Sequence, residues 1–190
     1  MKTLLAFLAL GTIVLCTDIS MLGIKIGTSE SALKNLKLEE MAREPGMVKY
    51  RTANGNDFSV TVENGKVIFM ENDWLQDPAA KQALLPGFTF GETSLADIRK
   101  RFGSNGFAFE SGAFSQTETH LILFNCYEFD SAGEEILVVI TKVPLDADVN
   151  EENLARTAKL EALIIASKSY LDENWGATKT YDPNNKKIKL

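Results

Sequence analysis

Few residues of the chain could carry metal or thiol chemistry. His120 is the only histidine among the 190 residues, and Cys16 and Cys126 are the two cysteines. On one extended strand His120 and Cys126, six residues apart, would face the same side. A zinc site needs three or four ligands of this kind, and no second pair is present. We therefore expect no metal and no cofactor, and we expect Cys126 to be a small core residue.

The sequence also contains few motifs that indicate nucleophilic or acid–base catalysis. A Ser-His-Asp triad would have to use His120, and no Gly-x-Ser-x-Gly turn positions a serine nucleophile. Gly23, Gly27, Gly87 and Gly91 are spaced as turns rather than as a phosphate-binding loop. Acidic residues are abundant, but a catalytic carboxylate pair is defined in space and not in sequence. The sequence predicts a protein that is not an enzyme, with a carboxylate-based activity left open.

Four residues are candidates for binding: Tyr50, Trp74, Asn125 and Tyr127. Tyr and Trp side chains combine a large contact area with a polar group, which is typical of protein interfaces. Asn125 is a polar residue within an apolar strand-like run. An open sheet face or its loops would have to present these side chains. For the aromatic residues the alternative is packing in the core.

Composition and charge narrow the class of partner. Hydrophobic residues make up 45% of the chain, which is typical of a folded protein. The formal net charge is -6, which disfavours nucleic acid and anionic lipid surfaces. An acidic surface of this kind would suit another protein that is basic.

The N-terminal segment MKTLLAFLALGTIVLC reads as a secretory leader. Its apolar run of about a dozen residues is shorter than the ~20 that span a bilayer, so no transmembrane segment is expected in the mature chain. We assign residues 1–17 to a signal peptide and expect an exported protein of the periplasm or cell envelope, or a secreted one. Leu15 disfavours a lipid anchor at Cys16, which is the minority route. A buried N-terminal segment of a cytosolic protein is the alternative to export.

The clearest structural signal is a β-meander. Asn54-Gly55 and Asn64-Gly65 separate runs that alternate between apolar and polar residues. Asn-Gly favours the type I′ turn of a hairpin, because both central residues need positive φ. The runs at 47–52, 57–62 and 66–71 are therefore predicted to be three antiparallel strands. A short amphipathic helix over 29–42, with Thr28 as its N-cap, is predicted to precede them.

The start of this unit recurs later in the chain. GIKIGTSESALKNL begins at Gly23, and GFTFGETSLADIRKRFG begins at Gly87. The second copy predicts a helix with Thr93 as its N-cap and Gly103 as its end. Three strands are predicted to follow it, within 106–111, 119–130 and 135–144.

These patterns predict an α+β fold of two related modules, each a short helix packed on a three- to four-stranded antiparallel sheet. The modules are assigned to residues 18–85 and 86–190. A long C-terminal helix over 150–176 completes the second module and has no counterpart in the first. Whether the modules share one sheet stays open at this stage.

The repeated unit resembles the small exported modules of the outer-membrane-assembly lipoprotein (SmpA/OmlA) family, which the β-lactamase inhibitory proteins carry in tandem. The residues that carry the resemblance are Gly27-Thr28-Ser29, Leu33, Tyr50 and Gly65-Lys66-Val67 in the first unit, and Gly91, Thr93-Ser94, Ile98 and Phe102 in the second. The resemblance implies an envelope module that binds protein and does no catalysis, and no functional residue carries over from it.

We therefore expect an exported, non-catalytic protein-binding module, either an envelope assembly accessory or an inhibitor or immunity-type protein. The alternative function is a small-ligand or lipid carrier with a pocket between helix and sheet.

Overall fold

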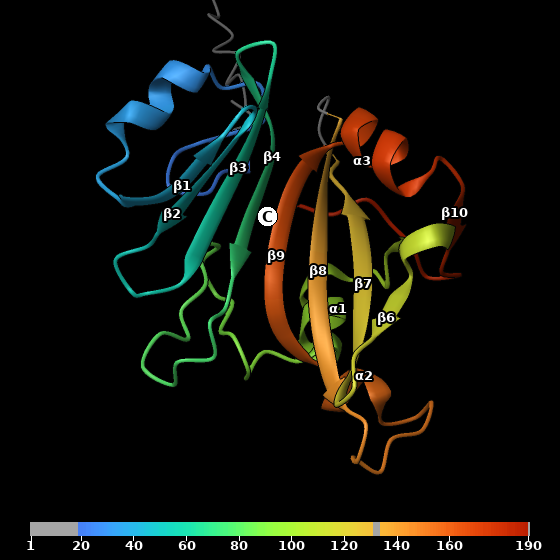
Figure 1. The fold of residues 1–190 in the computed structure, drawn as a ribbon. Helices are drawn as coiled ribbons and strands as arrows, with labels where there is room; N and C mark the ends of the chain where they lie inside the picture. The colour runs from blue at the N-terminus through green and yellow to red at the C-terminus, as the bar shows by residue number, and fades with distance from the viewer. Residues whose placement is uncertain (1–18, 131–133, 190) are drawn as a thin grey trace, which may run out of the picture.

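The computed structural model of the chain describes residues 19–130 and 134–189, and its main feature is one antiparallel sheet of ten strands (Figure 1). The strands are β1 (Glu39–Glu44), β2 (Met47–Arg51), β3 (Asp57–Glu63), β4 (Lys66–Asp73), β5 (Phe107–Phe109), β6 (Phe114–Gln116), β7 (His120–Glu128), β8 (Glu135–Pro144), β9 (Lys159–Ser167) and β10 (Lys179–Tyr181). They lie in the order β1-β2-β3-β4-β9-β8-β7-β5-β10, and β6 pairs with β7 outside this path. The helices are short: η1 (Glu30–Asn35), α1 (Leu95–Phe102), η2 (Glu110–Gly112), α2 (Leu154–Thr157) and α3 (Lys168–Trp175).

The predicted meander is confirmed. Strands β2, β3 and β4 pair in sequence, each antiparallel to the next. Asn64 and Gly65 have φ values of 49° and 71°, and they join the paired residues Glu63 and Lys66 as a two-residue turn. The Asn54-Gly55 connection is longer than a two-residue turn, since it begins with Thr52 donating its backbone N–H to Asn56 O over 2.8 Å.

The helix expected over 29–42 is wrong. A single stretch of 3₁₀ helix, η1, occupies its first part, and the edge strand β1 occupies the rest. Every residue of β1 is exposed, and the strand is held by pairing with β2. The apolar spacing that suggested a helix buries only Leu33 of η1, while Met41 of β1 is 46% exposed.

The long C-terminal helix is also wrong. The centre of that segment is strand β9, which lies between β4 and β8 in the middle of the sheet. Residues from Leu160 to Ala166 are apolar at nearly every position, because a strand buried on both faces reads as a continuous apolar run. Such a run also satisfies a helical spacing. The helix in this region is confined to α2 before the strand and α3 after it.

The predicted fold class therefore needs correction. The molecule is dominated by one continuous sheet, and it is not two helix-on-sheet modules with a long helix. Pairing of β4 with β9 joins the N-terminal and C-terminal strands. The second predicted helix is confirmed as α1, although its N-cap is Ser94 and not Thr93, and Gly103 ends it in the left-handed conformation.

The two segments that begin alike do enter the sheet alike. Gly27 donates its backbone N–H to Val67 O, and Val67 donates to Thr28 O. In the second half Gly91 donates to Leu160 O, and Leu160 donates to Thr93 O. Each segment therefore lies against the start of β4 or β9, the two strands that join the halves.

The main hydrophobic core lies on one face of the sheet. It is covered by η1, α1 and the connection that follows β4, and its largest buried side chains include Phe58, Phe88, Phe90 and Tyr127. A second cluster lies on the opposite face of β7, β8 and β9, where Leu171 of α3 covers it.

Candidate functional site

The first half of the sheet turns one face away from the main core. Its outward residues are Met47, Lys49, Arg51, Asp57, Ser59, Thr61, Glu71 and Asp73, which we call the open face. They are cross-strand neighbours on β2, β3 and β4, and all except Asp57 are half-buried. Among the described residues no helix covers this face, whereas α3 lies over the second half (Figure 1).

Asp57 is the best-shielded charge of the open face. Its side chain is 6% exposed, and it pairs with Lys49 Nζ at 2.6 Å and with Arg51 at 3.2 Å. Asn72, on the buried side of β4, donates to the backbone oxygen of Asp57 over 3.0 Å. The two cations neutralise the carboxylate, although its buried Oδ1 has no hydrogen-bond partner among the described residues.

Glu71 and Asp73 form a second acidic pair on β4. The two carboxyl groups interact through a side-chain hydrogen bond. The pKa of Glu71 is raised to about 7, mainly by burial and then by the negative charge of Asp73, while Lys49 opposes the shift. Burial is also the main cause that raises the pKa of Asp73. The pair therefore holds a proton around neutral pH and gains negative charge as it is lost.

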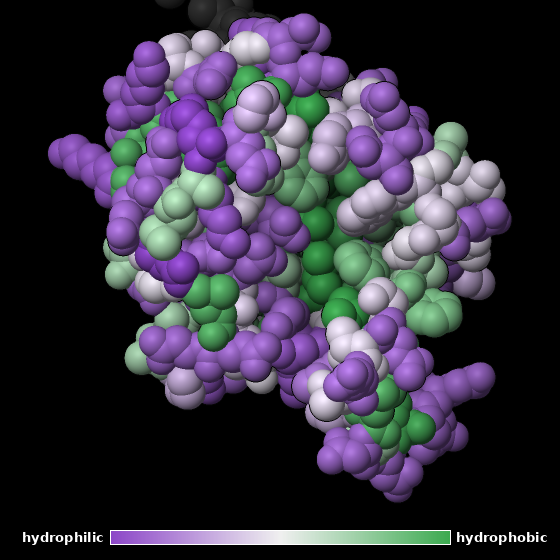
Figure 2. All heavy atoms as spheres, in the orientation of Figure 1, coloured by the Kyte–Doolittle hydropathy of each residue, from purple (hydrophilic) through white to green (hydrophobic). Residues whose placement is uncertain are grey.

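An apolar furrow borders the open face. Figure 2 shows it as a hollow with a hydrophobic floor, between the mainly hydrophilic first half and the second half. Beyond Glu71 the outward residues become apolar, with Ile164 on β9 and Val138 on β8. At one end Lys142 and Glu161 form an ion pair of 2.7 Å.

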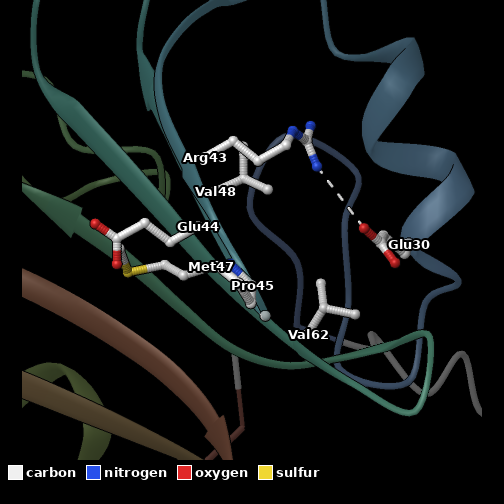
Figure 3. A pocket seen from close by; sticks show the side chains of 8 residues that line it. Glu30, Arg43, Glu44, Pro45, Met47, Val48 and Val62 are labelled. Atoms are coloured by element: carbon white, nitrogen blue, oxygen red, sulfur yellow. Dashed lines mark ion pairs between the residues drawn. The ribbon is translucent and has the colours of Figure 1, made fainter.

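A separate pocket of about 400 Å³ lies beside the β1–β2 turn (Figure 3). Glu30 of η1 faces Arg43 of β1 across it at 3.7 Å, and Arg43 also pairs with Glu40 at 2.7 Å. The apolar lining comes from Pro45, Met47, Val48 and Val62. Glu30 and Arg43 pair with one another and about half of each side chain is exposed, so this ion pair is a surface contact of small energy.

The structure places two of the four candidate binding residues in the core. Tyr50 is 3% exposed and stacks on Phe58 with ring centroids 6.3 Å apart. Tyr127 is fully buried and contacts the edge of Phe102 at 4.9 Å. These positions match the alternative of core packing, and a binding role for either tyrosine stays a prediction.

Trp74 and Asn125 are half-buried and lie apart, because Trp74 follows β4, Asn125 belongs to β7, and β9 and β8 separate those two strands. Trp74 stacks on Phe90 at 6.3 Å, and Lys142 Nζ lies 5.7 Å from its ring. Asn125 lines a small pocket beside α1. The four candidates thus form no common patch.

Thiol and metal chemistry find no support in the geometry. Cys126 is buried, and burial raises the pKa of its thiol to about 12. Within residues 19–130 and 134–189 no group of three or more His, Cys, Asp or Glu side chains is arranged to hold a metal ion.

Sequence reasoning missed Glu71, Asp73 and Asp57. The signal was present, because polar residues alternate with apolar ones along β2, β3 and β4. Alternation predicts a strand with one solvent-exposed face, but it does not reveal which side chains of different strands become neighbours.

The predicted leader and Cys16 lie outside the described residues. In the part of the chain that the structure describes, no helix has the length and apolar character that crossing a membrane requires.

No family model matches the chain, and no curated protein matches it. Solved structures resemble it, among them two bacterial proteins. An extracellular protein containing an SCP domain from Bacillus anthracis str. Ames has a TM-score of 0.44 and 14% identity, over 96% of this chain and 54% of that one. A cysteine-rich secretory protein from Staphylococcus aureus subsp. aureus Mu50 has a TM-score of 0.42 and 11% identity, over 86% of this chain and 51% of that one.

The chain spans about half the length of each of these two proteins. The predicted resemblance to the SmpA/OmlA and β-lactamase inhibitory protein families is wrong. No family model matches the chain, and one continuous sheet replaces the expected modules.

Proposed function

We propose that this chain is an exported, non-catalytic protein-binding module that contacts a basic partner through the open face. The observation that carries the proposal is the Glu71–Asp73 pair, which lies half-buried on an uncovered sheet face beside an apolar furrow. Half-buried charge next to apolar surface is an arrangement that a partner can complete by excluding water.

Charge argues for a basic partner. The chain has a formal net charge of -6, which steers cations toward it. A lysine or arginine placed beside Glu71 and Asp73 would favour their ionised forms and would lower their pKa values. Binding would then release a proton and would strengthen as the pH rises through about 7.

Defined peptides test the contact surface. We expect a labelled peptide of alternating Lys and Leu to bind, as measured by fluorescence anisotropy, and a Glu/Leu peptide of equal length not to bind. Ser59→Arg places a long cation in the middle of the open face and should weaken binding at least about tenfold. The matched control is Ser31→Arg, which adds the same charge at an exposed position of η1.

The control decides the outcome. Equal weakening by Ser59→Arg and Ser31→Arg would mean that only net charge matters, and the proposed surface would be wrong. Equal binding of the two peptides would contradict a basic partner. Circular dichroism of Ser59→Arg separates a blocked surface from a lost fold.

Export is proposed from residues 1–17, and it has its own test. A reporter enzyme that is active only outside the cytoplasm, fused after the leader, should be active. Leu8→Arg interrupts the apolar run and should abolish that activity. Thr3→Arg adds the same charge to the part of the leader where cations are tolerated and should leave the activity intact. Activity that persists in Leu8→Arg would argue against a secretory leader.

A further inference from the structure

A small pocket lies on the other face of the sheet, between α1, α2 and β7. It has a volume of about 180 Å³, and its lining includes Leu95, Arg99, Leu123, Asn125, Glu151 and Leu154. Side chains alternate along β7, so Asn125 faces the side of the main core with Tyr127, while Cys126 faces α3. The pocket is therefore separate from the open face.

Leucine side chains form the apolar part of the wall, beside the polar groups of Arg99 and Asn125. Leu95 belongs to a small hydrophobic cluster, and Leu123 and Leu154 pack against it. An apolar cavity of about 150 Å³ is large enough for one benzene ring. The space thus suits a compact apolar group and excludes a long acyl chain.

Arg99 is the unusual residue of the lining. Its side chain is half-buried, it makes no ion pair with any described residue, and its buried Nε has no hydrogen-bond partner there. By contrast, the half-buried Arg51 pairs with Asp57. A guanidinium removed from water without a carboxylate partner has unused hydrogen-bonding capacity.

Two neighbours of Arg99 add to this picture. The hydroxyl of Tyr127 is buried beside the guanidinium and interacts with it, although no hydrogen bond of ordinary geometry joins the two. The Asn125 side chain lines the same pocket and makes no hydrogen bond to another described side chain or backbone group. Planar donors of these kinds recognise carboxylates, and Arg does so with two parallel bonds.

We propose that this pocket binds a small carboxylate with a compact apolar body, in which Arg99 and Asn125 hold the carboxylate and the leucine side chains hold the body. The same chemistry is offered by a free aromatic acid and by the C-terminal residue of a peptide. Glu151 stands at the rim and is exposed, so its negative charge opposes the ligand.

The experiment adds benzoate to the whole protein and uses benzyl alcohol as the neutral control compound. We expect benzoate in millimolar amounts to shift the NMR signals of the Arg99 Nε–H and the Asn125 amide, and benzyl alcohol to shift them far less. Arg99→Met should weaken benzoate binding at least about tenfold. Lys100→Met removes the same charge from the exposed side of α1 and should change it less than about twofold.

Two further variants keep the test sharp if Arg99→Met unfolds. Glu151→Gln removes the opposing charge and should strengthen binding by about twofold. Asn125→Ala should weaken it. A peptide ending in Phe with a free carboxylate, compared with its amidated form, separates the two sources: stronger binding of the free form than of benzoate indicates a peptide terminus, and the reverse indicates a free acid.

The proposal fails if benzoate leaves the signals of Arg99 and Asn125 unchanged. It also fails if benzyl alcohol binds as well as benzoate, or if Arg99→Met and Lys100→Met weaken binding equally. The peptide probes of the open face do not depend on this pocket, so either result stands without the other.

Discussion

One row of cross-strand neighbours crosses the sheet and changes character at its centre. In the first half it runs through Lys49, Ser59 and Glu71. In the second half it continues through Ile164, Val138 and Cys126, all of them buried. All of these strands pair antiparallel. The side chains therefore decide whether this face is exposed to solvent or forms a core.

The two halves also differ in what covers this face. Over the second half α3 contributes Leu171 to the apolar cluster, and Trp175 meets Phe109 and Phe124 edge-on at 5.7 and 5.8 Å. Over the first half the charged groups pair with one another and stay partly in water. A partner protein would do for the first half what α3 does for the second.

The sharpest test of this difference exchanges the residue types of Ser59 and Val138. These two residues flank Glu71 and Ile164 at the centre of the row. Val138→Ser should lower the free energy of unfolding by about 3 kcal/mol, because it removes buried apolar surface and buries a hydroxyl. Ser59→Val should change it by less than about 1 kcal/mol. Urea unfolding measures both, and comparable losses would contradict the contrast between the halves.

Glu71, at the centre of this row, makes the stability of the first half depend on pH. The pKa of Glu71 is raised from 4.5 to about 7, so its protonated form is favoured by folding. That stabilisation is complete below pH 4.5 and is lost as the pH rises through 7, at a cost of about 3 kcal/mol. Glu71→Gln should remove this loss in urea unfolding at several pH values. An unchanged pH profile would mean that Glu71 does not carry the shared proton.

The two entry glycines also differ in surroundings. Both have positive φ, 82° at Gly27 and 69° at Gly91, so alanine is strained at either position. At Gly91 an added Cβ would also lie 2.5 Å from the Trp74 ring, while at Gly27 it meets nothing within 4 Å. Gly91→Ala should cost about 1 kcal/mol more than Gly27→Ala and should shift the tryptophan fluorescence. Equal costs would show that the Trp74 contact is easily relieved.

The smallest expected difference concerns the two helix starts. Ser94 caps α1, with its hydroxyl accepting from Asp97 N over 3.1 Å, whereas Ser29 makes no such bond at η1. Ser94→Ala should cost about 1 kcal/mol and Ser29→Ala close to nothing. Thermal unfolding of both variants checks this, and a larger loss for Ser29→Ala would reverse the comparison.

Local signals were enough for part of the fold. Positive φ at Asn64 and Gly65 belongs to these residue types, so the β3–β4 turn was predictable from the two residues alone. The same holds for α1, whose ends are set by Ser94 and Gly103. The candidate site was not predictable in this way, because Glu71 comes near Lys49 only after β2, β3 and β4 pair.

The sequence by itself determined the meander, α1 and the acidic, globular character of the chain, since each depends on neighbouring residues or on totals. Only the tertiary structure decided that residues 159–167 form the strand β9 and that β4 and β9 join the halves. A run of apolar residues can be buried equally well as a helix or as a central strand. The neighbouring strands β4 and β8 decide between the two, because they supply the hydrogen-bond partners of a strand. The same pairing placed Glu71 beside Ile164, where a charged face meets an apolar one.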